Sequence, residues 1–272
     1  MKTVFETIKE RRSVRTYDGN LLSEQHINDI KEYVKELKNP FDIPIEFVLL
    51  NAKEHGLSSP VLSGEEMYVA GKVEKKPYAD VAFGYSFEKL VLHAWELGIG
   101  TVWIGGTMNR DAFEKAAGVK EGGIMPCVSP LGYPAKKMSI KETMMRKGVG
   151  ADSRMSADKL FYESAWGQPL NISGDMSEVL EMVRWAPSAV NKQPWRIIVK
   201  DGICHFYEKK DKGYDHENTG DLQKIDIGIA LCHFDMAIEE KDMQTRIEIS
   251  DPGIEIPDNV EYIVSAKSNI YT

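Results

Sequence analysis

One property constrains the fold of this chain more than any other: its second half repeats the order of elements found in its first half. In the first half, a helical pattern that starts at Ile27 is followed by a β-type run from Ile45 and by a broad apolar helix over residues 80–97. The second half contains the corresponding segments in the same order, namely residues 176–185, 195–200 and 225–238. The chain is therefore predicted to contain two copies of one α+β unit in tandem.

Single positions support this correspondence. Gly228 stands in the second apolar helix where Gly84 stands in the first. We predict central antiparallel or mixed sheets flanked by helices, in an internally duplicated α+β fold. The predicted units are residues 1–150 and residues 151–272, and they meet at a Gly- and Ser-containing link over residues 148–156.

Other stretches give weaker patterns. Residues 51–76 contain glycines, serines and charges without a strong period, so they predict a loop with a short helix around residues 65–70. Residues 136–146 predict a basic tail to the first unit. Residues 160–164 are expected to hold the place in the second unit that residues 8–13 hold in the first.

Composition excludes several classes of protein. With 272 residues, of which 42% are hydrophobic, the chain is long enough for one large or two ordinary domains with buried cores. The net charge of -8 argues against a nucleic-acid surface, because a protein that neutralises phosphates needs a basic face. No run approaches the ~20 apolar residues of a membrane span, and the N-terminus lacks the apolar core of a signal peptide. We therefore expect a cytoplasmic protein without nucleic-acid or membrane partners.

The cysteines and histidines indicate no metal site. The three cysteines, Cys127, Cys204 and Cys232, are widely spaced and form no CxxC, so neither a disulfide framework nor a zinc site is indicated. No HxxxH or HExxH spacing occurs among the six histidines. His93 and His233 lie on apolar helices and are predicted to be packed core side chains.

The loop over residues 186–195 interrupts a helical pattern and leads directly into an apolar strand. Pro187 and Pro194 fix φ and remove two N–H donors, while Ser188 and Asn191 offer short polar side chains. Trp195 begins the strand. A rigid, polar loop of this kind between a helix and a sheet favours ligand binding.

The sequence PSAVNKQPW (187–195) resembles the P-S-x-x-N-x-Q-P-W signature of the FMN-dependent nitroreductase family. Two further stretches, RRSVR (11–15) and WIGG (103–106), are similar to the other flavin-contacting motifs of that family. Its members are typically homodimers with the flavin between subunits. In these proteins, the P-S-x-x-N motif follows the R-R-S-x-R motif by a few dozen residues. Here these two motifs lie in different halves, so the resemblance implies a dimer built into one chain.

The resemblance implies roles for the first two motifs. Arg11 and Arg15 suit the flavin phosphate, since guanidinium groups stay ionised and bind phosphate bidentately. Ser13 would donate its hydroxyl, and Arg12 would lie nearer the isoalloxazine or ribityl. Gly105 and Gly106 would let backbone N–H groups approach the ring edge. From the other half, the site would be closed by Pro187, Ser188, Asn191 and Gln193, with Lys72 a weaker candidate at the pyrimidine end and Lys137 or Arg146 at the phosphate.

Each motif taken alone is a common structural feature. An Arg-Arg-x-x-Arg run is usually a solvated helix end, a Trp-Ile-Gly-Gly turn is more often a plain loop, and an asparagine often forms a turn. Their joint occurrence in a duplicated frame favours the flavin site. No Gly-x-Ser-x-Gly motif occurs, and we assign no catalytic acid or base.

The motifs predict one site per chain. The first unit has residues 37–42 where the loop would stand, and the second has residues 163–166 and 251–253 in place of the arginines and the glycine turn. Glu163 is thus expected where a phosphate would need a cation. The retained motifs are complementary, so the second, pseudo-symmetric position is expected to bind no flavin.

The resemblance implies an oxidoreductase of the nitroreductase type, with FMN as cofactor and NADH or NADPH as electron donor. It would reduce a nitroaromatic, a quinone or a related small acceptor in alternating half-reactions. One alternative is a flavin-binding or degenerate module without catalysis, which would act in flavin storage, sensing or partner binding. Another is a specialised flavin chemistry on the same fold, such as dehalogenation or flavin destruction.

Overall fold

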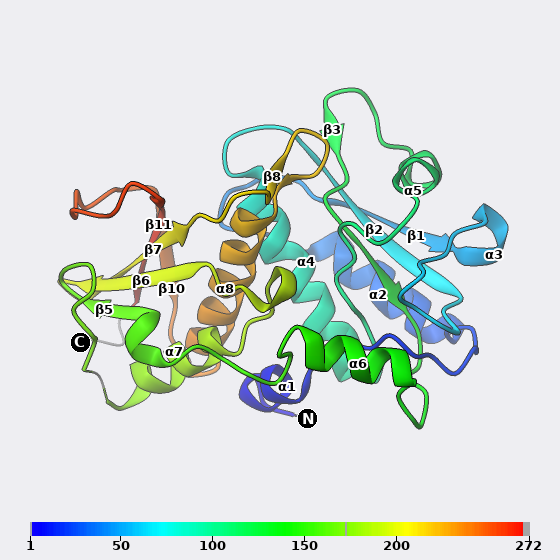
Figure 1. Cartoon of the computed structure of the whole chain (residues 1–272), viewed down its shortest axis with the longest axis horizontal. Coiled ribbons are helices and arrows are strands. Elements are labelled where there is room, and N and C mark those ends of the chain that lie inside the picture. The colour runs from blue at the N-terminus through cyan, green and yellow to red at the C-terminus, as the bar shows by residue number, and fades with distance from the viewer. Residues whose placement is uncertain (1, 172, 269–272) are drawn as a thin grey trace.

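The computed structural model describes residues 2–171 and 173–268, and it places two sheets on either side of a central pair of helices (Figure 1). Within the described residues, no helix is long and apolar enough to cross a membrane. The elements of the first half are α1 (Val4–Glu10), α2 (Glu24–Glu36), β1 (Glu46–Asn51), α3 (Ala52–His55), β2 (Met67–Glu74), α4 (Ala79–Glu96), α5 (Arg110–Ala117), β3 (Gly123–Ile124), β4 (Val128–Leu131) and α6 (Ile140–Gly148).

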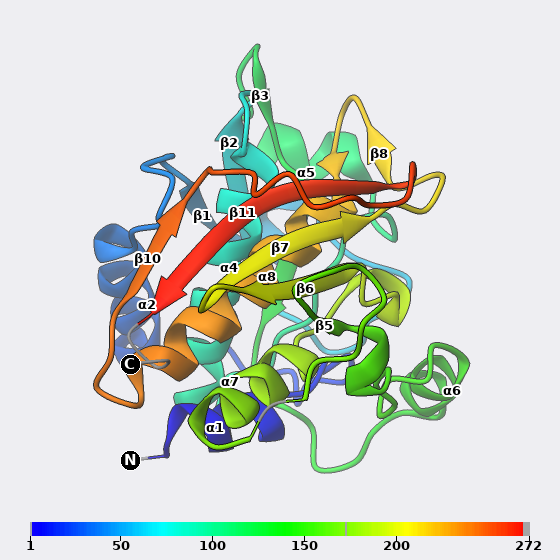
Figure 2. The same cartoon turned by 90° about the vertical axis from the view of Figure 1, so that its left-hand side faces the viewer.

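The second half contains a similar series of elements. They are the 3-10 turn η1 (Ala157–Lys159), β5 (Phe161–Glu163), α7 (Asp175–Arg184), the 3-10 turn η2 (Ala189–Asn191), β6 (Trp195–Lys200), β7 (Ile203–Lys209), β8 (Asp215–His216), β9 (Gly220–Asp221), α8 (Leu222–Glu239), β10 (Thr245–Glu248) and β11 (Val260–Ser268). Figure 2 shows the sheet of this half in front of α8.

The two sheets have the same core topology. In the first, β2 lies between β1 and β4, and both pairings are antiparallel. In the second, β7 lies between β6 and β11, again with antiparallel pairings. This order confirms the predicted α+β fold, in which α4 and α8 each cover one face of the sheet formed by their own half.

Two predictions from the weaker patterns are wrong. Residues 67–74 form β2 and not a short helix, because this central strand is buried on both faces and therefore lacks the alternation that marks a half-exposed strand. Position 71 of this strand is occupied by glycine, and a Cβ there would lie 2.7 Å from the Phe83 ring. Residues 140–146 of the predicted basic tail belong to α6 (Ile140–Gly148), whose N-cap Ser139 accepts a hydrogen bond from the Glu142 N–H.

The predicted place of residues 160–164 is also wrong. Ser13 pairs in parallel with Thr101, beyond β4 in the first sheet. The segment β5 instead pairs in parallel with β6, at the opposite edge of its sheet. Glu163 is exposed there and does not occupy the position that corresponds to the arginines.

The two halves meet where α4 crosses α8 at a pair of glycines. A Cβ on Gly84 would lie 2.0 Å from the carbonyl oxygen of Ile225, and a Cβ on Gly228 would lie 2.0 Å from that of Val81. The two contacts are equivalent, because each glycine meets the carbonyl of the residue three positions before the other glycine. Only glycine permits this approach, so the predicted match of Gly84 with Gly228 marks an internal twofold relation.

The glycine crossing gives a first prediction. Gly84→Ala should lower the free energy of unfolding by about 1–3 kcal/mol or more, since overpacking a helix crossing forces the backbones apart. Urea unfolding measures the change. Gly148→Ala is the matched control, because a Cβ on Gly148, at the end of α6, meets nothing within 4 Å. If Gly84→Ala had the same free energy of unfolding as Gly148→Ala, the close approach of α4 and α8 would be contradicted.

Candidate functional site

The 11–15 segment leaves the end of α1 and brings its arginines into the interior. The Arg11 side chain is 5% exposed, and its Nη2 lies 3.5 Å from Oε1 of the fully buried Glu88 on α4. Glu88 also accepts a hydrogen bond from Trp103 Nε1 at 3.0 Å and lies 3.0 Å from Nε2 of His233 on α8. A single carboxylate therefore ties the arginine motif, the glycine-turn motif and the second half together.

Four guanidinium groups gather beside this network, and we call Arg11, Arg15, Arg146 and Arg154 the guanidinium cluster. Burial lowers the pKa of Arg154 to about 10, and the next cause is the nearby charge of Arg11. Burial also lowers the pKa of Arg15, which Arg146 lowers further while Glu142 opposes the shift. Arg11 and Arg146 have carboxylate partners in Glu88 and Asp152, whereas Arg15 and Arg154 form no ion pair among the described residues, so the cluster holds more guanidinium groups than paired carboxylates.

The cluster also holds unpaired donors. The Nε atoms of Arg11, Arg15 and Arg154 are buried without a hydrogen-bond partner among the described residues. Leaving a buried charged donor unsatisfied is costly, so such atoms point to a missing acceptor. A phosphate group supplies several acceptor oxygens and up to two negative charges, and the cluster therefore fits the phosphate of FMN.

Arg12 and Ser13 take different places. Arg12 lies 3.4 Å from the buried Glu142 carboxylate on α6, which also accepts a hydrogen bond from the Thr16 hydroxyl at 2.7 Å. Ser13 is half-buried and pairs its backbone with Thr101. The buried carboxylate balances part of the charge of this segment and joins it to α6.

The 186–195 loop has an unusual backbone. Val190, Asn191 and Gln193 have φ angles of 43°, 60° and 50°, in the left-handed region that favours glycine. Val190 is β-branched and 60% exposed, so neither its conformational preference nor burial explains this geometry. Strained residues persist only where surrounding contacts determine them, and they often mark functional sites.

Hydrogen bonds hold the loop in this conformation. Ser188 Oγ accepts from the Gln193 N–H at 2.8 Å, and the Asp226 carboxylate on α8 accepts from the Ala189 N–H at 3.1 Å. Asn191 Nδ2 donates to the Gly150 carbonyl at 2.8 Å. The side chains of Ser188, Asn191 and Gln193 thus fix the loop, and the link between the two halves holds it from outside.

The glycine turn lies against the start of α8. A Cβ on Gly105 would lie 3.8 Å from Leu222, and one on Gly106 would meet nothing within 4 Å. The carbonyl of Gly105 accepts a hydrogen bond from Arg110 Nη2 at 2.6 Å, which fixes the turn. Because Asp226, one turn further along α8, holds the 186–195 loop, the two motifs meet on the same end of this helix.

Lys72 is the sequence-predicted residue that the structure does not bring to this region. Its Nζ lies 2.8 Å from the Glu46 carboxylate on β1 and donates to the Gly118 carbonyl at 3.3 Å. Neither partner belongs to an element that carries another candidate. The sequence placed Lys72 after Gly71 in a supposed loop, whereas the observed β2 strand directs it toward α5.

The pseudo-symmetric counterpart of this region has a different chemistry. The loop at Pro40 corresponds to the 186–195 loop, and residues 251–253 stand in place of the glycine turn. Beside the loop at Pro40 lies a small hollow of about 240 Å³, lined by Pro40, Phe41, Asp42, Ile43, Pro77, Tyr78, Ile247, Glu248 and Ile249. This lining includes two acidic side chains and no lysine or arginine. In the described part of the chain β10 is an edge strand, so no segment there corresponds to residues 11–15.

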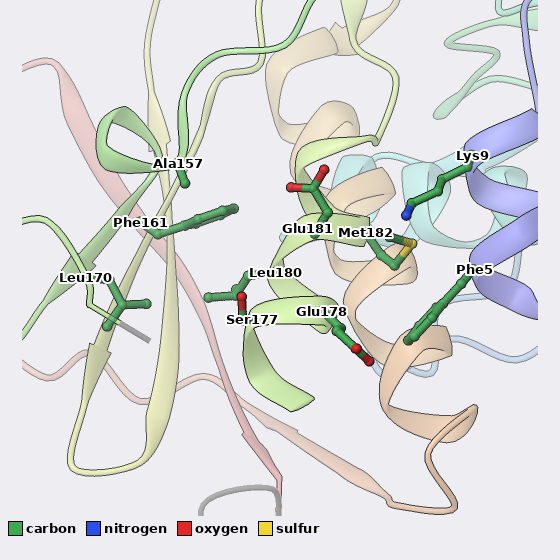
Figure 3. A pocket seen from close by; sticks show the side chains of 10 residues that line it. All are labelled: Phe5, Lys9, Ala157, Phe161, Leu170, Ser177, Glu178, Leu180, Glu181 and Met182. Carbon is green, nitrogen blue, oxygen red and sulfur yellow. The ribbon is translucent and has the colours of Figure 1, made fainter. Parts of the chain in front are cut away.

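A larger groove of about 440 Å³ lies elsewhere, between α1 and α7 (Figure 3). Phe5 and Lys9 line it from α1, and Glu178 and Glu181 line it from α7. None of the sequence-predicted site residues lines this groove. Its two carboxylates would repel a phosphate, so the guanidinium cluster fits the flavin phosphate better than this groove does.

Two parts of the site were not predicted from the sequence. Arg154 lies on the link, where a lone arginine among small and polar residues belongs to no motif. Glu88 and His233 lie on the two central helices, and His233 was predicted to be a packed core residue. It is fully buried as predicted, but its Nδ1 donates to the Met182 carbonyl at 3.0 Å and its Nε2 faces Glu88. The one sequence feature that could have indicated this network is Glu88, a charged residue on the otherwise apolar helix α4.

Buried carboxylates cluster around the start of α8. Burial raises the pKa of Glu208 on β7 to about 8, and the neighbouring Asp221 raises it further. Burial likewise raises the pKa of Asp226 well above its usual range, while its hydrogen bond from Ala189 opposes the shift. These groups bind protons more tightly in the folded chain, so the stability of this region depends on pH.

The comparisons agree with this fold. A family model described as "Putative TM nitroreductase" matches residues 3–238, and the chain therefore belongs to this nitroreductase family. A solved structure described as a putative nitroreductase from Thermotoga maritima is similar with a TM-score of 0.63 and 19% identity, over 97% of this chain and 93% of that chain. This likeness shows a shared fold along nearly the whole length.

Shorter structures match about half of the chain. A nitroreductase with bound FMN from Bacteroides fragilis has 24% identity and a TM-score of 0.41, over 52% of this chain and 92% of that chain. A nitroreductase family protein from Clostridium difficile has 14% identity and a TM-score of 0.44, over 54% of this chain and 92% of that chain. Among curated proteins, none matches the sequence.

The anchored loop gives a second prediction. Asn191→Ala should lower the free energy of unfolding by about 1–3 kcal/mol, because it removes the bond to Gly150 and places alanine at a left-handed φ. Lys192→Ala is the neighbouring control, since it removes only surface contacts: an exposed ion pair with Asp211, worth about 0–1 kcal/mol, and a cation–π contact 6.0 Å from the centre of the Tyr214 ring. Chemical denaturation compares the two variants. Equal losses would mean that Asn191 does not hold the loop.

The carboxylates near α8 give a third prediction. The pKa of Glu208 is raised in the folded chain, so its contribution to stability is fully present below the unfolded pKa and is lost as the pH rises toward about 8. From roughly pH 5 to pH 8, the free energy of unfolding should fall by about 2 kcal/mol more in the wild type than in Glu208→Gln. Parallel curves for the two proteins in urea titrations at several pH values would refute this.

Proposed function

We propose that this protein is an FMN-dependent oxidoreductase that uses NADH or NADPH to reduce a small acceptor, such as a nitroaromatic or a quinone, by two electrons. The observation that carries the proposal is the guanidinium cluster, with three buried Nε donors that lack a partner among the described residues. Membership of the nitroreductase family supports the same function. We place the activity in the cytoplasm, where reduced nicotinamides are available.

The residues of this chain would bind and orient the cofactor. Arg11 and Arg15 would hold the phosphate with charge-assisted hydrogen bonds, and Ser13 lies on the same segment. Gly105 and Gly106 leave room for a flat ring to approach the backbone, since a Cβ on Gly105 would lie 3.8 Å from Leu222 at the start of α8 and one on Gly106 would meet nothing within 4 Å. The 186–195 loop would close the site from the other half without having to rearrange, because its hydrogen bonds already fix it.

The chemistry would need few protein groups. FMN, when bound, supplies hydride acceptance from the nicotinamide and electron transfer to the acceptor. The protein would exclude water, orient both substrates in turn, and stabilise negative charge near the glycine turn with backbone N–H groups. We assign no catalytic acid or base.

A single chain would hold a complete site. Residues 1–150 contribute the 11–15 segment and the glycine turn, and residues 151–272 contribute the 186–195 loop. The arrangement that other family members would form between subunits is intramolecular here, so the chain would work as a single-chain pseudo-dimer.

The number of sites gives a fourth prediction. Titration of the protein with FMN, followed by quenching of flavin fluorescence, should saturate at about one equivalent per chain, because the counterpart hollow is lined by two carboxylates and by no lysine or arginine. Under anaerobic conditions, NADH or NADPH should bleach the yellow absorbance of the bound flavin, and a nitroaromatic or a quinone should restore it. Absence of FMN binding would refute the function, and two equivalents would refute the single site.

A further inference from the structure

We propose that helix α6 and the residues just before it form a surface that binds membranes containing anionic lipids. This surface, which we call the α6 surface, consists of residues 136–147. The inference does not depend on the proposed function. The sequence predicts no membrane partner because it has no spanning run, but a helix that lies along the surface of a bilayer needs no such run.

The inner face of α6 is fixed to the first half. Glu142 is 1% exposed, and its carboxylate accepts a hydrogen bond from the Thr16 hydroxyl at 2.7 Å and lies 3.4 Å from Arg12. Ile140 and Met144 stand two positions before and two positions after Glu142, which places them on the opposite side of the helix. Ile140 is 82% exposed and Met144 is 68% exposed. The outward face of α6 is therefore apolar at these two positions.

Exposed apolar side chains are concentrated in this segment. Among the residues that the structure describes, six large apolar side chains are exposed, and three of them are Met138, Ile140 and Met144. Single exposed apolar residues are normal in a folded protein, whereas a group within one short segment indicates an interaction site. Helix α6 lies at the outer edge of the molecule, where a flat surface can reach these side chains (Figure 2).

The same segment is basic in an acidic protein. Residues 136–147 contain five cations and one carboxylate, whereas the whole chain has a net charge of -8. Arg146 pairs with Asp152, and the lone carboxylate, Glu142, faces Arg12. The other four cations are exposed and form no ion pair among the described residues; they are Lys136, Lys137, Lys141 and Lys147. Because salt screens charges beyond about 10 Å, an anionic membrane would interact with these lysines and not with distant acidic residues.

The composition of the α6 surface favours lipid over a protein partner. Protein interfaces are enriched in aromatic residues and arginine and depleted in lysine. Here the unpaired cations are all lysines, and residues 136–147 contain no aromatic residue. Lys147, three positions after Met144, lies on the same outward face. Its long side chain can reach lipid phosphates while Ile140 and Met144 enter the apolar boundary of the bilayer.

The test measures how the protein sediments with vesicles of phosphatidylglycerol mixed with phosphatidylcholine, and with vesicles of phosphatidylcholine alone. The wild type should bind the mixed vesicles, and added salt should release it. Ile140→Ser should lower the partition coefficient at least about tenfold, because it removes the most exposed apolar side chain of the surface. Ile249→Ser is the matched control, since Ile249 is 56% exposed in the second half, and it should stay within about twofold of the wild type.

A second pair of variants tests the charge. Replacement of Lys141 and Lys147 together by glutamine should weaken binding at least about tenfold, because each lysine near an anionic surface contributes about fivefold. Replacement of Lys31 and Lys35 by glutamine removes the same charge from the exposed face of α2 and should have less than about a twofold effect. All these positions are exposed, so every variant should keep the wild-type midpoint of urea unfolding.

The contrary results are distinct. A wild type that does not sediment with the mixed vesicles, or that binds neutral vesicles equally well, would overturn the inference. An α6 variant that binds as tightly as its control would overturn it too. A wild type that is dimeric without lipid and becomes monomeric in Ile140→Ser would assign the α6 surface to a second copy of this chain. The sedimentation contains no flavin, so a protein that fails to bind FMN would refute the proposed function and leave this inference standing.

Discussion

The close crossing of α4 and α8 is the contact on which the rest of the structure depends. At Gly84 and Gly228 each helix backbone touches the other, with no side chain between them. This approach sets the separation of the two sheets and aligns the start of α8 with the glycine turn of the first half. The site is therefore positioned by the helix pair and only completed by the loops.

Charge at the centre of the molecule couples this crossing to the site. Glu88 on α4 meets His233 on α8, Arg11 at the end of α1 and Trp103 before the glycine turn. A buried carboxylate is costly unless it is paired, and here its partners come from both halves. Loss of one partner would leave charge uncompensated, which explains why motif residues from distant parts of the sequence are held in one arrangement.

The repeated pattern predicted more of the fold than of the site. The order of helices and strands, the α+β class and the glycine match follow from periodicity and alignment of the two halves. Strand β2 could not be predicted because it is buried on both faces, and α6 could not because its charged helix has no broad apolar face. The place of residues 160–164 was wrong because a short β-type run does not say which strand it will pair with.

Motifs in the sequence predicted the residues of the proposed flavin site, whereas the residues that hold them in place could be found only in the structure. Arg11, Arg15 and the 186–195 loop could be named from the sequence. Arg154 could not, since its proximity to Arg11 depends on the path of the link. Lys72 is the opposite case. It was predicted from the sequence, but it lies on strand β2 and contacts Glu46 and Gly118, away from the other candidate residues.

The central claim is that one flavin site is built from both halves of a single chain, and the structure of the protein bound to FMN tests it most directly. One flavin per chain is expected, with its phosphate between Arg11, Arg15 and Arg154 and its ring between the glycine turn and the 186–195 loop. A flavin in the groove between α1 and α7, in the hollow beside Pro40, or between two separate chains would contradict the claim.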